Sequence, residues 1–256
     1  MTQQNTTNVV RRLDQRLAHL QAGILAQVQQ GAVYNDIWDL CCDHGRLGLH
    51  LHQQPALAQA QLHLIDCVPS IIEQLQLVHG ARLDARLRFA CMDAAQIVLP
   101  VQGNQALVIA GVGGDTCISI LQALLTQITA MQSPDSLQFF TDVYLSPNTG
   151  CYELRQFLGG HNAQVLSEDF ISAKGFHHEH IVARFARQQP NLEQGVPPAA
   201  ISPVGISLWR PFTREKKIYL QKLLGHHQKV NAYRPELWRT QAIADYQALI
   251  GELAEV

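Results

Sequence analysis

Residues 39–48 read Asp-Leu-Cys-Cys-Asp-His-Gly-Arg-Leu-Gly, and they decide the fold of this chain. The short apolar run before them is typical of the end of a buried strand, and the leucines that follow suit the start of a helix. A strand, a tight turn with glycine and a helix form the first unit of a nucleotide-binding α/β fold. The turn departs from the G-x-G-x-x-G pattern, because Cys41 and Asp43 stand where glycine would be expected. Alone, it is also compatible with an ordinary turn.

The composition bounds the remaining possibilities. Of the 256 residues, 47% are hydrophobic and 16% are charged, which excludes general disorder. The net charge of −2, from 19 basic and 21 acidic residues, argues against a protein covered in nucleic acid but leaves room for a local basic face. We find no apolar stretch near the ~18 residues of a membrane span and no secretion signal. The six cysteines form no C-x-x-C pair, which favours buried reduced thiols over zinc or disulfides and predicts a cytoplasmic protein without metal.

Apolar runs and helical spacings alternate along the first three quarters of the chain. The predicted strands are 35–40, 61–66, 87–91, 106–110, 137–145, 163–166 and 178–185, with helices at 9–30, 46–51, 69–78, 118–131 and 152–158 between them. The fold class is therefore α/β, with a Rossmann-like, seven-stranded sheet that ends in an antiparallel pair. This strand plan is typical of class I S-adenosylmethionine (SAM) methyltransferases rather than of dehydrogenases.

The composition changes after residue 187, and the last part of the sequence no longer alternates between strands and helices. We expect a SAM-binding methyltransferase domain at 1–187, a linker at 188–205 rich in Pro, Gln, Ala and Gly, and a helical, coiled-coil-like domain at 206–256. The last part reads as an antiparallel helical hairpin with a break near Tyr233-Arg234-Pro235.

Acidic residues follow the first three strands, where an open parallel sheet binds its ligands. Asp66 is placed to bind ribose hydroxyls, Asp93 the adenine amine, and Asp39 or the loop backbone the methionine part. Such acids also cap helices, and for Asp93 alone capping is the stronger interpretation. The predicted cofactor-binding residues are Asp39, Cys41, Gly45, Asp66, Cys67, Met92, Asp93, Ala110 and Gly111.

These motifs together carry a family resemblance. In order, they are Asp39-x-x-x-Asp43-His44, Ile109-Ala110-Gly111-Val112-Gly113-Gly114, Ser146-Pro147-Asn148, and Val204-Gly205 before a basic helix. The chain resembles the bacterial tRNA (adenine-22-N1)-methyltransferases, the TrmK family, from about residue 12 to 253. It departs from the family pattern at 41–46, where Gly-Ser-Asp-His-Ala-Tyr is usual, and at Val112, Ser146 and Asp66, where Met, Gln and Glu are usual. The resemblance implies SAM as cofactor, tRNA as partner, and methylation of adenine N1 at position 22.

The chemistry can be argued from the residues. Adenine N1 already has a lone pair, so methyl transfer needs alignment more than proton removal. The product ring is cationic, and a carboxylate on the exocyclic amine would stabilise it or accept a proton. Asp43 is the candidate, and the resemblance implies the same aspartate. His44 either orients it or belongs to the helix start, and Asn148 is a third catalytic candidate, on the base edge. The chain lacks the Asn-Pro-Pro-Tyr motif of many amino-methyltransferases, which argues against N6 methylation.

Other residues point to the substrate. Predicted substrate-binding residues are Gly113, Gly114, Arg210, Arg214, Lys216 and Lys217, which Arg11, Arg12 and Arg16 could join. The glycines are equally suited to a strand-to-helix turn, and the charges to a solvated face. The run 177–180, His-His-Glu-His, looks like a metal cluster. On a strand its members alternate between faces, so we expect edge and solvent-facing residues there.

Other functions stay open. A methyltransferase of this fold could act on rRNA or a small molecule, or the chain could be a non-catalytic protein that binds RNA or a nucleotide. The glycine spacing and the terminal hairpin oppose a dehydrogenase. The expected oligomeric state is a monomer or weak dimer.

Overall fold

The centre of the molecule is one mixed sheet. The computed structural model describes residues 12–80, 85–130, 139–173, 175–186 and 201–254. Its strands run in the order β3-β2-β1-β4-β5-β7-β6. They are β1 (Asp36–Leu40), β2 (Gln61–Asp66), β3 (Leu87–Cys91), β4 (Gln105–Ala110), β5 (Phe140–Ser146), β6 (Gln164–Ala173) and β7 (Phe176–Ala186). Strands β1 to β5 pair in parallel, and β7 is antiparallel to both β5 and β6. This confirms the predicted fold class.

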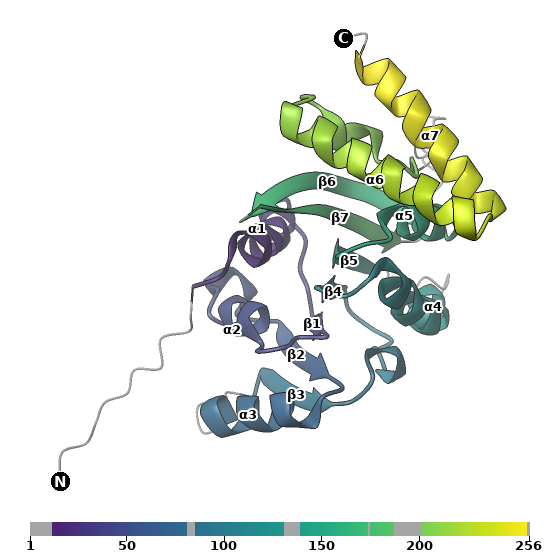
Figure 1. The fold of residues 1–256 in the computed structure, drawn as a ribbon. Coiled ribbons are helices and arrows are strands. Elements are labelled where there is room, and N and C mark those ends of the chain that lie inside the picture. The colour runs from purple at the N-terminus through teal and green to yellow at the C-terminus, as the bar shows by residue number, and fades with distance from the viewer. Residues whose placement is uncertain (1–11, 81–84, 131–138, 174, 187–200, 255–256) are drawn as a thin grey trace, which may run out of the picture.

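Helices cover both faces of the sheet (Figure 1). Alternate residues of a strand point to opposite faces, so Leu107 and Ile109 of β4 pack with α4 (Gly114–Ala130) and α5 (Cys151–Gly160). Ala106 and Val108 pack on the other face with α1 (Gln15–Gln29), α2 (Arg46–His52) and α3 (Pro69–His79). Because neither face is solvated, β1 and β4 are buried along almost their whole length.

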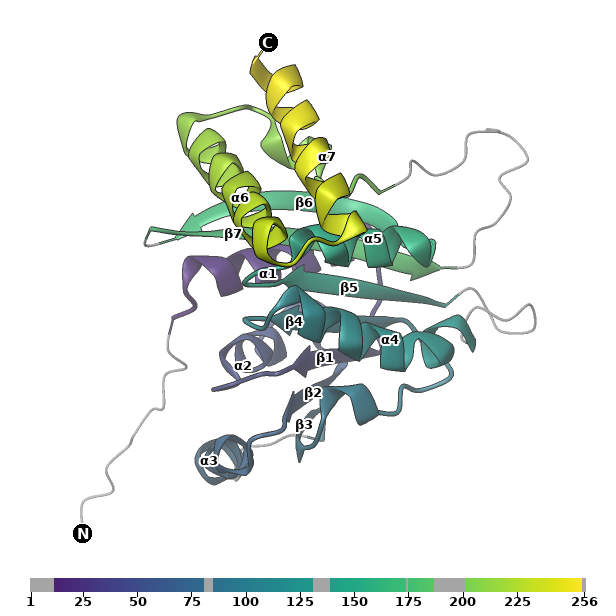
Figure 2. The same cartoon turned by 45° about the vertical axis from the view of Figure 1, so that its right-hand side comes forward.

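The chain ends in a helical hairpin, α6 (Arg214–Tyr233) and α7 (Leu237–Ala254), which lies across β6, β7 and α5 (Figures 1 and 2). The break between the helices falls where it was predicted. A 3-10 turn, η4 (Ile206–Trp209), leads into it. Tyr152 of α5 packs with Trp209, Leu220 and Tyr246 in one buried cluster, which joins the hairpin to the sheet domain.

A buried ionic network crosses the same junction. The fully buried Arg155 donates from Nε to Glu168 and from Nη1 to Glu179, at 2.6 and 2.7 Å. The hydroxyl of Tyr219 on α6 donates to the second oxygen of Glu179. Gly205 has φ +61, and a Cβ there would lie 2.7 Å from Arg155 Nη2, so the turn before the hairpin requires glycine. The domain limits at 187 and 206 stay a prediction.

Three element boundaries differ most from the expectation. Helix α1 begins at Gln15 rather than residue 9, because the Asp14 side chain accepts the Leu17 N–H and caps it; residues 1–11 lie outside the described chain. Helix α4 begins at Gly114 rather than Ile118, directly after the glycine turn. Strand β6 continues to Ala173 rather than Leu166, since its polar residues pair with β7.

Two expectations about burial are wrong. Glu179 and His180 are not solvent-facing: both are buried, Glu179 against Arg155 and His180 with Nε2 3.2 Å from Ser146 Oγ. The six cysteines are free, and Cys42, Cys117 and Cys151 are buried. Cys67 and Cys91, however, are exposed, because they come just after β2 and at the end of β3.

Within the described ranges, no helix is long and apolar enough to cross a membrane. The same residues contain no group of three or more His, Cys, Asp or Glu side chains that could hold a metal ion.

Candidate active site

The loop between β1 and α2 has an unusual backbone. Cys41 (φ 58) and Asp43 (φ 50) both adopt the left-handed conformation, as does Gly45 (φ 62). Non-glycine residues rarely adopt it, and where they do the strain is frequently found at functional sites. The Asp43 N–H donates to Asp66 Oδ2 at 3.0 Å, which anchors the loop to the end of β2. The two positions where the sequence lacked an expected glycine are therefore glycine-like in conformation.

Asp39, the first acid of this loop region, is buried at the end of β1. Its Oδ2 accepts the Gly48 N–H of α2 at 2.9 Å. The pKa of Asp39 is raised to about 7, chiefly by burial and to a lesser extent by the charge of Asp66, while the hydrogen bond from Gly48 lowers it. A carboxyl group with a pKa near neutrality loses its proton readily when a cation binds beside it.

Asp66 is the last residue of β2, and Asp93 follows β3. Asp66 is buried and accepts two backbone N–H groups, from Asp43 and from Val68. A carboxylate has about four lone-pair positions, so it can still accept from ligand hydroxyls. Asp93 is exposed and accepts the Ala95 N–H at 2.9 Å, which caps the 3-10 helix η3 (Ala94–Gln96). The capping role considered from the sequence is thus present.

The turn after β4 forms the facing wall. Gly111 has φ +82, and its carbonyl accepts from Asn148 Nδ2 at 2.6 Å. The Asn148 N–H donates to the Val112 carbonyl at 2.8 Å. A Cβ on Gly114 would lie 2.4 Å from the Gly150 carbonyl oxygen, so Gly114 is needed for contact between the two loops. With its amide nitrogen occupied, Asn148 can face a ligand through its oxygen.

A small cavity of about 130 Å³ lies between the β1–α2 loop, Ala110 at the end of β4 and the start of α1. Five predicted residues line it: Asp39, Cys41, Asp43, His44 and Ala110. His44 Nε2 lies 3.8 Å from Asp43 Oδ1, and both side chains are more than two-thirds exposed. An exposed carboxylate next to an imidazole, beside buried acids, suits contact with a polar reactant.

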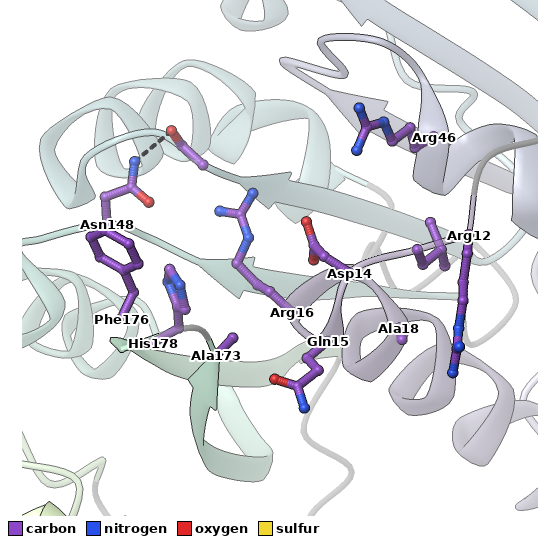
Figure 3. A pocket seen from close by; sticks show the side chains of 12 residues that line it. Arg12, Asp14, Gln15, Arg16, Ala18, Arg46, Asn148, Ala173, Phe176 and His178 are labelled. Atoms are coloured by element: carbon purple, nitrogen blue, oxygen red, sulfur yellow. Dashed lines mark hydrogen bonds between the residues drawn. The ribbon is translucent and has the colours of Figure 1, made fainter.

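A larger cavity of about 900 Å³ adjoins it and also contains Arg16 and Arg46 in its lining (Figure 3). Gly111 and Asn148 line it too, with Phe176 and His178 of β7. Arg16 lies close to Gly111: a Cβ there would be 3.3 Å from Arg16 Nη1. In Figure 3 the side chains of Arg16 and Arg46 point into the cavity from α1 and α2. Arg12 also lines the cavity. These three arginines have no ion-pair partner among the described residues and outnumber the one carboxylate of the lining, Asp14, so the cavity favours an anion.

Other predicted residues lie outside these cavities. Gly45 is buried, and a Cβ there would meet Leu64 and Leu75, which gives it a packing role. Cys67 is exposed after β2, and the Met92 N–H donates to the Asp66 carbonyl after β3. Gly113 precedes α4 and is half-buried. Their contacts with a ligand stay predictions.

The predicted basic residues Arg210, Arg214, Lys216 and Lys217 lie at or just before the start of α6. Glu215 among them accepts from Ser172 and is 3.0 Å from His177 Nε2, so this end stands over the β6–β7 turn. Phe176 of that turn lines the larger cavity. The start of α6 is therefore a neighbour of the active edge.

Sequence reasoning missed several lining residues, among them Asp14, Arg46, Phe176 and His178. Arg46 could have been found, because it directly follows the Asp-His-Gly loop and must share its edge. Phe176 was indicated only weakly, as an aromatic residue beside Gly175 in a turn. Phe176 and His178 line the cavity because the start of β7 lies beside α1, which the sequence does not reveal.

A parallel sheet with acids after β1 and β2, a glycine turn after β4 and an antiparallel β7 defines a nucleotide-binding α/β protein of the methyltransferase type. The chain belongs to the methyltransferase domain family, which matches residues 13–181. No curated protein matches it in sequence.

Solved structures share the whole architecture. The B. subtilis M1A22 tRNA methyltransferase TrmK has a TM-score of 0.65 at 15% identity, with 95% of this chain and 98% of that chain covered. M. capricolum TrmK in complex with S-adenosylhomocysteine (SAH) has 0.61 at 16% identity, with 96% and 97% covered. A Streptococcus pneumoniae protein in complex with SAM has 0.64 at 14% identity, with 93% and 99% covered. These similarities show the fold, including the terminal hairpin.

Proposed function

We propose that this chain is a SAM-dependent methyltransferase that methylates N1 of adenine in tRNA, at position 22. One observation carries the proposal: a strained loop holds the exposed Asp43 beside a cavity lined with arginines, at the edge where nucleotide-binding sheets bind. Membership of the methyltransferase family supports the reaction class. Structural neighbours whose names include tRNA (m1A22) methyltransferase support the substrate, since they match nearly the full length.

The residues at this edge fit SAM. Asp66 would accept the ribose hydroxyls with its remaining lone pairs, and Asp39 would face the methionine ammonium. Cys41, Ala110 and Gly111 would approach the chain of the cofactor through their backbone. Cys67, Met92 and Asp93 are placed after β2 and β3 for the adenine end. When bound, SAM supplies the methyl group as an electrophile.

The protein's part in the reaction is alignment and charge stabilisation. Asp43 would accept a hydrogen bond from the exocyclic amine of the target adenine, which favours the positive charge that the ring acquires. Asp43 or water can then take a proton from that amine. His44 would orient Asp43, and Asn148 Oδ1 would accept from the base edge while Nδ2 stays on Gly111. Gly113 and Gly114 have no side chains, so the turn after β4 would leave space for the base to approach.

The charges suit an RNA chain despite the overall negative balance. Arg16 and Arg46 would hold phosphates next to the target nucleotide. Arg210, Arg214, Lys216 and Lys217 at the start of α6 would extend this contact over the β6–β7 turn. A concentrated basic face can bind RNA even on an acidic protein.

The test is transfer of a labelled methyl group from SAM to bulk tRNA, followed by digestion to nucleosides. We expect the label in 1-methyladenosine. Label in N6-methyladenosine, or SAM binding without any labelled RNA, would refute the proposed reaction.

A further inference from the structure

A second cavity, of about 630 Å³, lies between α5, the β6–β7 turn and α6. It shares Asn148, Phe176 and His178 with the arginine-lined cavity, so the two are continuous along one side of the molecule. The reaction proposed above uses only one nucleotide, and it leaves this second cavity without a role.

Aromatic rings form much of its wall. His177 and Tyr219 have ring centroids 5.3 Å apart, and His227 and Tyr246 are stacked at 5.6 Å with 29° between their planes. Tyr152 and the exposed Phe176 complete the lining on the sheet side. Flat walls of this kind suit a flat aromatic guest, because each base of a nucleic acid presents a π-face that stacks on such rings.

Three lining side chains have unpaired polar atoms. Glu153 Oε2, His178 Nδ1 and His227 Nδ1 are buried without a hydrogen-bond partner in the described part of the chain. His227 as a whole is only 8% exposed. Burial lowers the pKa of His227 to about 4, so its ring is neutral at pH 7 and one nitrogen can accept. Buried polar groups are normally paired, so these atoms leave hydrogen-bonding capacity beside the cavity, with a carboxylate oxygen of Glu153 as an acceptor.

The rim of the cavity carries the positive charge of Lys222. Lys222 and His226 of α6 line the cavity and are exposed. Lys222 has no ion-pair partner among the described residues. An aromatic interior with a carboxylate acceptor and a cationic rim matches a nucleotide, with its base inside and its phosphate at the rim.

We propose that this cavity binds a second nucleotide of the RNA substrate, one whose base carries an amino group. The base stacks on the aromatic lining of the cavity, its amine donates to Glu153, and its phosphate contacts Lys222. The site rests on the proposed RNA substrate, and it would fix the RNA chain on one side of the target adenine.

The phosphate contact is tested with one variant and a matched control. Binding of bulk tRNA to the SAH-saturated protein is measured by filter binding for Lys222→Glu and for the control Lys229→Glu. Lys229 is exposed on the same helix and lines none of the three cavities described above. We expect Lys222→Glu to weaken binding about ten-fold and Lys229→Glu to change it less than three-fold. Equal effects of the two lysine variants would overturn the site.

Base selectivity is tested with single nucleotides. Cytidine 5′-monophosphate (CMP) carries the amine and uridine 5′-monophosphate does not, so the SAH-saturated protein should bind CMP several-fold more tightly in a calorimetric or NMR titration. Glu153→Gln should remove that preference while SAH affinity stays unchanged. Equal binding of the two nucleotides to the wild-type protein, or a preference that survives in Glu153→Gln, would overturn the inference.

The outcomes separate this site from the reaction itself. If CMP and tRNA bind as expected but no methylated adenosine forms, the proposed reaction fails and the second site stands. If tRNA is methylated and Lys222→Glu leaves the KM for tRNA unchanged, the second site fails and the reaction stands.

Discussion

The loops after β1 and β4 face each other across the candidate site, yet they use the left-handed backbone differently. After β4 the left-handed residue is Gly111, which has no steric penalty. After β1 it is adopted by Cys41 and Asp43, at a cost of roughly 1–3 kcal/mol each. A glycine in either place would remove the strain and the side chain together. The difference indicates that the first loop provides side chains for chemistry, whereas the second provides space.

The largest expected effect is on Asp43. Replacing Asp43 by Ala should lower methyl transfer by about 10²–10⁴-fold, because the charge on the base loses its carboxylate. SAM affinity, measured by calorimetry, should change little. The matched control is Asp115→Ala, which removes an exposed carboxylate from the helix start after the second loop and should retain most of the activity. Equal losses in both variants would break the contrast between the loops.

A substitution in the second loop, after β4, should lower the stability of the protein. Gly114→Ala places a methyl group 2.4 Å from the Gly150 carbonyl, against backbone that cannot move aside cheaply. We expect a loss of about 3 kcal/mol in the free energy of unfolding, measured by urea denaturation. Gly225→Ala is the control: nothing lies within 4 Å of its Cβ, and alanine in α6 should stabilise the protein slightly. A Gly114→Ala protein as stable as the wild type would contradict the close packing of these loops.

Asp39 makes cofactor binding depend on pH. Because the pKa of Asp39 is raised to about 7, the carboxyl is mostly neutral at pH 6 and charged at pH 8. A charged Asp39 attracts the methionine ammonium, so SAM affinity should rise about ten-fold over this range. The Asp39→Asn variant should lose that rise. An affinity that is flat with pH in the wild type would remove the proposed contact.

The same pKa has a consequence for stability. The folded state holds the proton of Asp39 more tightly than the unfolded chain does, so this contribution is full at acidic pH. It is lost as the pH rises from the ordinary carboxyl range to about 7. The stability of Asp39→Asn relative to the wild type should therefore increase over that interval, which thermal unfolding at several pH values would check.

The smallest effect separates conformation from chemistry at Asp43. Both Asp43→Gly and Asp43→Ala should be inactive, but the glycine variant should be more stable by about 1 kcal/mol, since only alanine is strained at φ 50. At Asp115, in the first turn of α4, the order should reverse, because alanine has the higher helix propensity. Denaturation curves of the four variants test both statements, and the same order at both positions would contradict a left-handed Asp43.

Much of the fold could be predicted because its information is local. The predicted bounds of β2 and β3 agree with the structure, since short apolar runs between turn residues mark buried strands. Strand β6 was predicted too short, because the side chain of its polar residue Glu168 is buried through partners far along the chain, Arg155 of α5 and Ser207 of η4. Glu179 was expected in solvent for the same reason. Such burial depends on a distant partner, which no local pattern reveals.

In the candidate site, too, some residues could be predicted from the sequence and others could not. The loop carrying Asp39 and Asp43 was found from the sequence, because residues at the ends of parallel strands meet at one edge. The lining by Phe176 and His178 was not found, since it needs the position of the β6–β7 turn beside α1. The packing roles of Gly45 and Gly114 likewise follow from neighbours far along the chain.

The most direct test of the account uses two unmodified tRNA transcripts that differ only at position 22, one with adenine and one with guanine. Each is incubated with SAM and either the wild-type protein or Asp43→Ala, and methylated nucleosides are quantified by mass spectrometry. We predict 1-methyladenosine only from the adenine transcript and only with the wild-type protein. N6-methyladenosine, methylation of both transcripts, or full activity of Asp43→Ala would contradict the account.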